Sequence, residues 1–153
     1  KGSLSVHFNG EEIRLLHLGA GHTDGDVIIW FTESNVVHMG DQFFNGRFPY
    51  IDLGSGGRVA GYQKNVETVL NNLPGGALII PGHGALAEKQ DLQAFAVMLK
   101  DTINPVRQSI SLNKTLDQIK AAGVPEKYKT WGVGFINTSR WLEIVYNSLT
   151  SEP

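Results

Sequence analysis

The sequence contains no cysteine, and this single absence excludes several kinds of site. A chain without thiols forms no disulfide, binds no metal through thiolate and has no cysteine nucleophile. The lack of cysteine does not determine the cellular compartment, because proteins without disulfides occur on both sides of a membrane. We expect a soluble protein, and a cytoplasmic, periplasmic or secreted location is equally compatible with the composition.

Long apolar runs and an excess of one charge are also missing. No apolar stretch approaches the roughly 20 residues that a membrane-spanning helix needs. Thirteen Lys and Arg residues stand against 15 Asp and Glu residues, which gives a net charge of −2. That balance provides no basic surface for nucleic acid or anionic lipid. We therefore expect neither a nucleic acid nor a membrane as partner.

The overall composition is typical of a globular protein. With 153 residues, 41% of them hydrophobic and 18% charged, the chain is long enough to bury a core. We expect one domain over 1–153. Glycine is abundant at 18 residues, which is typical of tight loops that carry function. The start at Lys1, without Met, indicates a chain cut from a longer protein.

The hydrophobic pattern predicts an antiparallel sheet followed by helices. Asn9-Gly10 is a hairpin signal, and Pro105 is expected to kink or split the longest helix. A long irregular loop is expected over 40–57. Alternation or apolar runs predict strands over 5–8, 12–18, 26–31, 36–39 and 77–80. Helical spacing predicts helices over 58–73, 88–111, 115–122 and 139–149.

The expected fold class is thus α/β, more closely α+β, with a mostly antiparallel sheet and flanking helices. The helices over about 113–150 form a C-terminal extension. Asn137 or Thr138 is expected to cap the last helix.

Three predicted strands are each followed by glycine and then by a residue able to bind a metal. These residues are His22, Asp41 and His83. Strand ends that continue into glycine-rich loops present side chains to a cleft. Two imidazoles and a carboxylate suit zinc, and a carboxylate can also bridge two metals. Each motif alone has a plainer interpretation as a turn or a packed histidine, so the prediction depends on their order and shared context.

Three segments together resemble the metallo-β-lactamase superfamily: His22-Thr23-Asp24-Gly25-Asp26, Gly40-Asp41 and Pro81-Gly82-His83-Gly84. The resemblance covers roughly residues 4–100. It implies half of an αββα sandwich with a dinuclear or mononuclear metal site. It further implies that His22 binds the first metal, His83 binds the second, and Asp41 is the bridging, catalytic carboxylate.

The superfamily's His-x-His-x-Asp-His motif is absent, and no His-x-His occurs anywhere in the chain. The resemblance therefore implies the C-terminal half of a metal-dependent hydrolase, with the missing N-terminal half as its partner. In the parent enzyme, one or two zinc ions would activate water against an ester, thioester, lactone or amide-type bond of a small-molecule substrate. Iron or manganese are alternatives to zinc. We expect partial or no metal binding, and no activity, in the isolated chain.

Other residues are expected around this site. Thr23 and Asp26 are candidates for orienting an imidazole. Phe44, Arg47 and Tyr50 belong to an aromatic loop over 43–52 that walls the cleft or packs beneath it. One large subgroup of β-lactamases has Cys where this chain has Asp41 and Lys where it has Phe44, which argues against that subgroup.

Three further aromatic residues and two histidines are assigned structural roles. His17 and His38 are expected to be packed or hydrogen-bonded, since strand alternation separates His38 from the metal-facing positions. Tyr128, Trp131 and Phe135 cover the cleft or pack the last helix, and packing is favoured.

Two alternative functions remain open from the sequence. One is an iron-dependent member of the same superfamily with redox or sulfur chemistry. The other is a non-catalytic half-domain that self-associates, because half a sandwich exposes an apolar sheet face and unpaired strand edges. We therefore expect the isolated chain to form a dimer or a swapped homo-oligomer.

Overall fold

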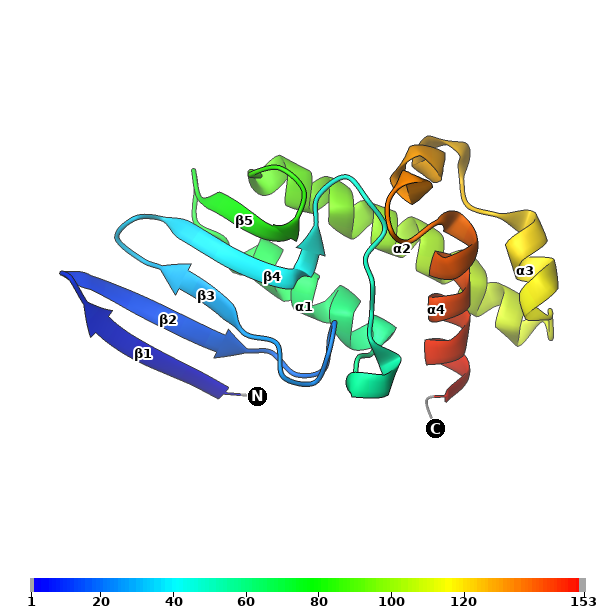
Figure 1. Cartoon of the computed structure of the whole chain (residues 1–153), viewed down its shortest axis with the longest axis horizontal. Coiled ribbons are helices and arrows are strands. Elements are labelled where there is room, and N and C mark those ends of the chain that lie inside the picture. Colours follow the sequence, from blue (N-terminus) through cyan, green and yellow to red (C-terminus); the bar gives the residue numbers. More distant parts are fainter. Residues whose placement is uncertain (1, 152–153) are drawn as a thin grey trace.

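The computed structural model describes residues 2–151 and contains a five-stranded sheet (Figure 1). The start at Lys1, from which the sequence suggested a cut chain, lies outside this range. Strands β1 to β4 form an antiparallel meander, whereas β5 pairs parallel to β4. The predicted meander is confirmed. The strands are β1 (Gly2–Phe8), β2 (Glu11–His17), β3 (Ile28–Phe31), β4 (Val36–Phe44) and β5 (Leu78–His83).

The helices cover one face of the sheet and extend beyond its end, as Figure 1 shows. Side-chain caps fix the starts of two helices, and the cap of the last helix was expected from the sequence. Thr115 and Gln118 form a capping box at α3, and the Asn137 side chain accepts the Arg140 N–H at the start of α4. The helices are α1 (Val59–Asn72), α2 (Lys89–Ser111), α3 (Leu116–Ala122) and α4 (Thr138–Ser151), with 3₁₀ turns η1 (Leu53–Ser55) and η2 (Glu126–Val133). None in the described range is long and apolar enough to cross a bilayer.

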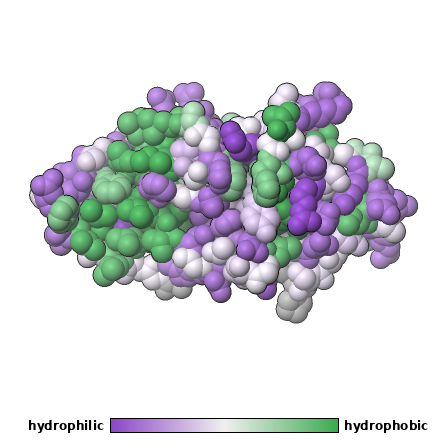
Figure 2. All heavy atoms as spheres, viewed as in Figure 1, coloured by the Kyte–Doolittle hydropathy of each residue, from purple (hydrophilic) through white to green (hydrophobic). Residues whose placement is uncertain are grey.

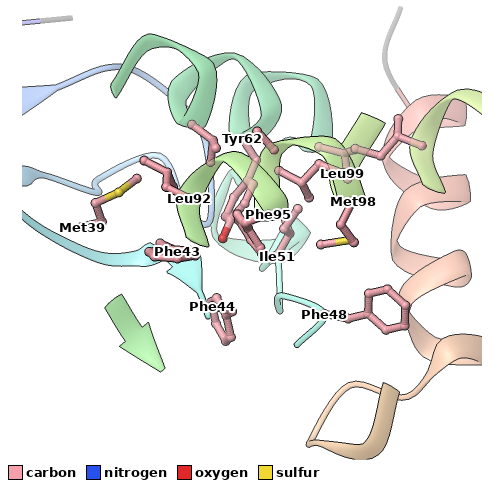
Figure 3. Close-up of a cluster of buried hydrophobic side chains, with 14 of the residues drawn as sticks. Met39, Phe43, Phe44, Phe48, Ile51, Tyr62, Leu92, Phe95, Met98 and Leu99 are labelled. Carbon is pink, nitrogen blue, oxygen red and sulfur yellow. The ribbon is translucent and has the colours of Figure 1, made fainter. Parts of the chain in front are cut away.

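The core lies between the sheet and helices α1, α2 and α4. The apolar positions of α1 recur at helical spacing, and Tyr62 is among the fully buried ones. Its ring meets Phe95 of α2, which in turn contacts Phe43 at the end of β4 (Figure 3). This packing anchors the end of β4 that carries Asp41.

β4 and β5 run further at their C-terminal ends than the sequence pattern predicts. β4 continues through Gly40 to Phe44, so the expected loop over 40–57 is shorter, and Asp41 lies within the strand. Gly40 adopts φ +51°, and the pairing register shifts on both sides of it. Such a bulge lets the strand continue past a glycine at which the sequence pattern predicts the end of the strand. β5 likewise includes His83.

Of the two effects predicted for Pro105, a kink or a split, the split does not occur. The helix is continuous from Lys89 to Ser111 with Pro105 inside it. Buried side chains lie on both sides of the proline, including Leu99, Ile103 and Val106. Packing of both halves therefore outweighs the roughly 3 kcal/mol that an interior proline costs.

The sheet has one covered face and one open face. Ile28, Val37 and Ile79 face the helices and are buried. The register places Leu4 and Val6 on the opposite face, where they pair with Leu15 and Ile13. Leu4 is 61% exposed, and Phe8 on the same face is 71% exposed. Figure 2 shows hydrophobic residues gathered over the strands. The expected half-sandwich with an exposed apolar face is thus present.

Candidate functional site

The loop between β2 and β3 holds His22 through a dense set of hydrogen bonds. Asp26 accepts from the Thr23 N–H (2.7 Å), the Thr23 hydroxyl (3.1 Å) and the Gln42 side-chain amide (2.6 Å). A side chain at Gly21 would overlap the end of the Gln42 side chain, which would have to move away from Asp26. The Asp52 N–H donates to the His22 carbonyl at 2.9 Å. Thr23 and Asp26 therefore fix the loop rather than line the cavity.

His22 presents one ring nitrogen outward. Its Nδ1 lies 2.8 Å from the Tyr50 carbonyl oxygen. Because a carbonyl only accepts, Nδ1 carries the proton and Nε2 keeps a lone pair. The side chain is only 15% exposed, and Nε2 lies 3.4 Å from Asp41 Oδ2. This arrangement prepares Nε2 to bind an electrophile such as a metal ion.

His83 approaches the other oxygen of the same carboxylate. Its Nε2 lies 3.4 Å from Asp41 Oδ1, and its ring stacks on Phe44 with centroids 4.5 Å apart. Gly82, the residue before it, has no room for a side chain beside Asp41. The three predicted ligands are therefore brought together, with Asp41 between the two imidazoles.

The donors form two pairs rather than one cluster. Each pair consists of one imidazole nitrogen and one oxygen of Asp41. Across residues 2–151, no group of three or more His, Asp or Glu side chains is arranged to hold a metal ion. Nitrogen and oxygen donors of this type suit zinc, but two donors are fewer than the three protein ligands of a catalytic zinc site. The chain offers two incomplete positions that share a carboxylate.

A cavity of about 200 Å³ opens beside these donors. The residues of the aromatic loop after β4 take two kinds of position. Phe44, Arg47 and Tyr50 line the cavity, whereas Phe43 and Ile51 are buried beneath it. The lining residues are His22, Asp41, Phe44, Arg47, Phe48, Tyr50, His83, Phe135 and Ile136.

Known proteins that share this architecture include metallo-beta-lactamases and a sec-alkylsulfatase. No family model matches the chain. A curated relative, metallo-beta-lactamase type 2 of Bacteroides fragilis, is 26% identical over 82 residues, which are 54% of this chain and 33% of the relative. The sec-alkylsulfatase Pisa1 from Pseudomonas sp. matches with a TM-score of 0.71 at 15% identity, over 96% of this chain and 25% of that protein. The metallo-beta-lactamase from Pontibacter korlensis matches with a TM-score of 0.57 at 13% identity, over 65% and 46%.

The chain has the metallo-β-lactamase fold. It spans about a third of the curated relative and from a quarter to under half of these solved structures. Such partial coverage is consistent with the C-terminal half that the sequence suggested. The sulfatase match covers 96% of this chain, whereas the two lactamase matches cover 54% and 65% of it.

Within this metallo-β-lactamase fold, the C-terminal segment contributes Phe135 and Ile136 to the cavity wall, and the sequence analysis did not single out Ile136. For Phe135 the less favoured alternative holds: it is 91% exposed and lines the cavity, with its ring centroid 6.2 Å from that of Tyr50. In the sequence, the nearby Gly132 and Gly134 were the signal that Phe135 lies in a surface loop. The packing expectation is confirmed for Tyr128, which is buried, and for Trp131, whose ring stacks near Phe95.

Other polar groups near the site have structural roles. His17 Nδ1 bonds the Asp26 carbonyl, and His38 Nδ1 accepts the Gly40 N–H. Both match the roles expected from the sequence. The Ser55 hydroxyl donates to Asp52 and lowers the pKa of that carboxyl below its usual value, so Asp52 stays ionised as it caps η1.

Proposed function

We propose that this chain is part of a metal-dependent hydrolase in which Asp41 bridges two zinc positions, with His22 on one and His83 on the other. One observation carries the proposal: the two oxygens of Asp41 each face the Nε2 of a different imidazole, both at 3.4 Å. The hydrolase names of the relatives support it.

The chemistry follows from the bound metal and from what these residues hold in place. Zinc, when bound, lowers the pKa of a coordinated water toward 7, so that hydroxide is available at neutral pH. The Tyr50 carbonyl fixes the His22 ring, and Phe44 fixes the His83 ring by stacking. Asp41 keeps the two positions at a set separation. The bond attacked is an ester, thioester, lactone or amide-type bond.

The remaining ligands, in this proposal, come from a further part of the same domain. Each metal position has two donors from this chain, and catalytic zinc has about three protein ligands. The open apolar face of the sheet is where that part packs, because the covered face already holds the helices. The isolated chain is therefore expected to turn over no substrate.

The test is metal content and hydrolysis in a protein that joins this chain to the rest of its domain. Asp41→Asn should lose metal and lower the hydrolysis of a thioester and lactone panel by about 100-fold or more. Asp24→Asn, an exposed change in the His22 loop, is the matched control and should retain both. Full activity and metal content in Asp41→Asn would refute the proposal.

Metal analysis of the same protein separates zinc from the iron-dependent alternative. Stoichiometric iron with visible colour, in place of zinc, would favour redox or sulfur chemistry over hydrolysis.

A further inference from the structure

We propose that Gln42 is a positioning residue, which ties the loop that carries His22 to β4 beside Asp41. Gln42 follows Asp41 directly, and its side chain is only 2% exposed. Its Nε2 donates to Asp26 Oδ2, in the loop before β3, at 2.6 Å. The consequence for metal binding rests on the proposed function, but the placement of His22 does not.

Backbone pairing does not hold this part of β4 to the loop. The pairs between β3 and β4 end at Ile29 and His38. Gln42 lies beyond that end, where no backbone hydrogen bond crosses from β4 to the loop within the described chain. The side-chain bond from Gln42 to Asp26 therefore makes the connection that the strand pairing no longer provides.

The contacts of Gln42 bear on both sequence neighbours of His22. Asp26, which accepts the Gln42 amide, also accepts the N–H and the hydroxyl of Thr23, the residue after His22. On the other side of His22, the Gln42 amide lies so close to Gly21 that a Cβ there would overlap it. A shift of Gln42 would therefore reach the imidazole through its own backbone.

His83 is held in a different way. β4 and β5 pair in parallel as far as Phe44 and His83, so backbone pairing keeps this histidine beside β4. Its ring stacks on Phe44, and its carbonyl accepts the Asn45 N–H at 2.8 Å. None of these contacts involves Gln42. Loss of the Gln42 amide should therefore disturb His22 and leave His83 in place.

The amide of Gln42 is not the group that packing alone would favour. Its Oε1 is buried and has no hydrogen-bond partner in the described chain. A buried acceptor without a partner lowers stability, whereas an apolar side chain of similar length avoids this cost. The donor half of the amide, which the link to Asp26 requires, explains why a polar side chain stands at this position.

Imidazole spectra of the protein that joins this chain to the rest of its domain, kept metal-free with EDTA at pH 8, test the placement. Long-range ¹H–¹⁵N spectra report which nitrogen of each imidazole carries the proton. In the parent, His22 should carry it on Nδ1 alone. Gln42→Met should give a mixture of both tautomers at His22 and no change at His83. Tyr128→Phe, which also removes one hydrogen bond to a carboxylate, is the matched control and should change neither.

Zinc binding to the same proteins measures the consequence for the site. Gln42→Met should weaken binding at the His22 position by about tenfold or more and leave the His83 position unchanged. Asp26→Asn weakens the same link from its other end with almost no change in volume. It should reproduce the selective effect on His22, and it decides the matter if Gln42→Met does not fold.

Three results would overturn the proposal: an unchanged His22 spectrum in either folded variant, equal changes at His22 and His83, or the same change in Tyr128→Phe. A parent protein that binds no zinc would refute the proposed function alone, because the metal-free spectra still decide the role of Gln42.

Discussion

At the scale of single residues, Asp41 depends on two glycines for its position. Gly40 takes a left-handed conformation that shifts the strand register just before Asp41. Gly82 passes so close to the carboxylate that a side chain there would collide with it. The positive φ of Gly40 explains the glycine before the acid, and the close approach at Gly82 explains the glycine before the imidazole.

Tyr62 provides a test of the buried environment next to this carboxylate. Its hydroxyl is fully buried and has no hydrogen-bond partner within the described chain. Burial, and then the charges of Asp41 and Asp26, raise its pKa well above the usual value. Tyr62→Phe should therefore increase the free energy of unfolding by about 1 kcal/mol, because an unsatisfied polar group is removed.

Tyr128→Phe is the matched control, since the Tyr128 hydroxyl donates to Asp101 at 2.8 Å. That variant should lower the free energy of unfolding by about 1 kcal/mol. Urea denaturation at pH 7 measures both. A Tyr62→Phe protein less stable than the parent would mean that the hydroxyl has a partner.

Local sequence predicted His22, Asp41 and His83 because each follows an apolar run and glycine. It did not predict Gln42, whose amide donates to Asp26, because that bond joins residues on different strands. The sequence also could not decide whether Phe135 packs or covers the cleft. Its place at the cavity depends on how η2 and α4 fold back toward Tyr50.

At the scale of elements, α1 supports the His22 loop through a close contact at Gly61. A side chain there would overlap the Ala20 carbonyl, and Asn65 on the next turn donates to the Gly19 carbonyl at 3.1 Å. Gly61→Ala should lower the free energy of unfolding by about 2 kcal/mol through steric overlap. Helix propensity alone would give the opposite sign.

Gly75→Ala controls for this change, because nothing lies within 4 Å of the added atom. Its effect should stay within about 0.5 kcal/mol. Thermal or urea unfolding compares the two variants. Stabilisation by Gly61→Ala would show that α1 does not approach the loop as described.

The contact between α2 and η2 has a predictable pH dependence. The Lys127 ammonium donates to Asp101 at 2.8 Å, and Tyr128 donates to the same oxygen. The Lys127 hydrogen bond, followed by that of Tyr128, lowers the pKa of Asp101 below 3.8. A carboxyl with a lowered folded-state pKa stabilises the protein above its unfolded pKa and loses this effect as the pH falls through its folded pKa.

Asp101→Asn should therefore cost about 1 kcal/mol at pH 7, the upper range for a partly exposed ion pair. The difference from the parent should shrink as the pH falls below about 4. Glu33→Gln, on an exposed turn, should change stability at neither pH. A difference for Asp101→Asn that persists unchanged at pH 3 would contradict this account.

The periodicity of the sequence predicted which segments are helices and which are strands. Two details of these elements, however, depend on tertiary structure. The helix over 58–73 was expected from its spacing and is present as Val59–Asn72. The sequence left open whether Pro105 kinks or splits α2, which is continuous, and it did not predict the extension of β4 past Gly40. Both depend on neighbours far away in the sequence, which stabilise a local conformation that the residues alone disfavour.

At the scale of the whole molecule, the open sheet face determines how the isolated chain behaves. Leu4, Val6 and Phe8 project from an edge strand with no cover on that side. Apolar surface and an unpaired edge both favour association. We expect a second copy of the chain to cover this face when the rest of the domain is absent, giving a dimer by light scattering at micromolar concentration.

Val6→Glu should shift that dimer toward monomer, because it places a charge on the open face. Ser3→Glu adds the same charge to the same strand on the opposite face and should leave the dimer in place. A parent chain that remains monomeric would contradict the expectation.

The most direct test of the central claim is a zinc titration of the chelator-stripped protein that joins this chain to the rest of its domain, followed through the imidazole resonances of this chain's five histidines. The account predicts that His22 and His83 respond together, while His7, His17 and His38 stay unchanged. Asp41→Asn should remove the response, and Asp24→Asn should preserve it. Equal shifts at all five histidines, or no shift at His22 and His83, would contradict a metal site built around Asp41.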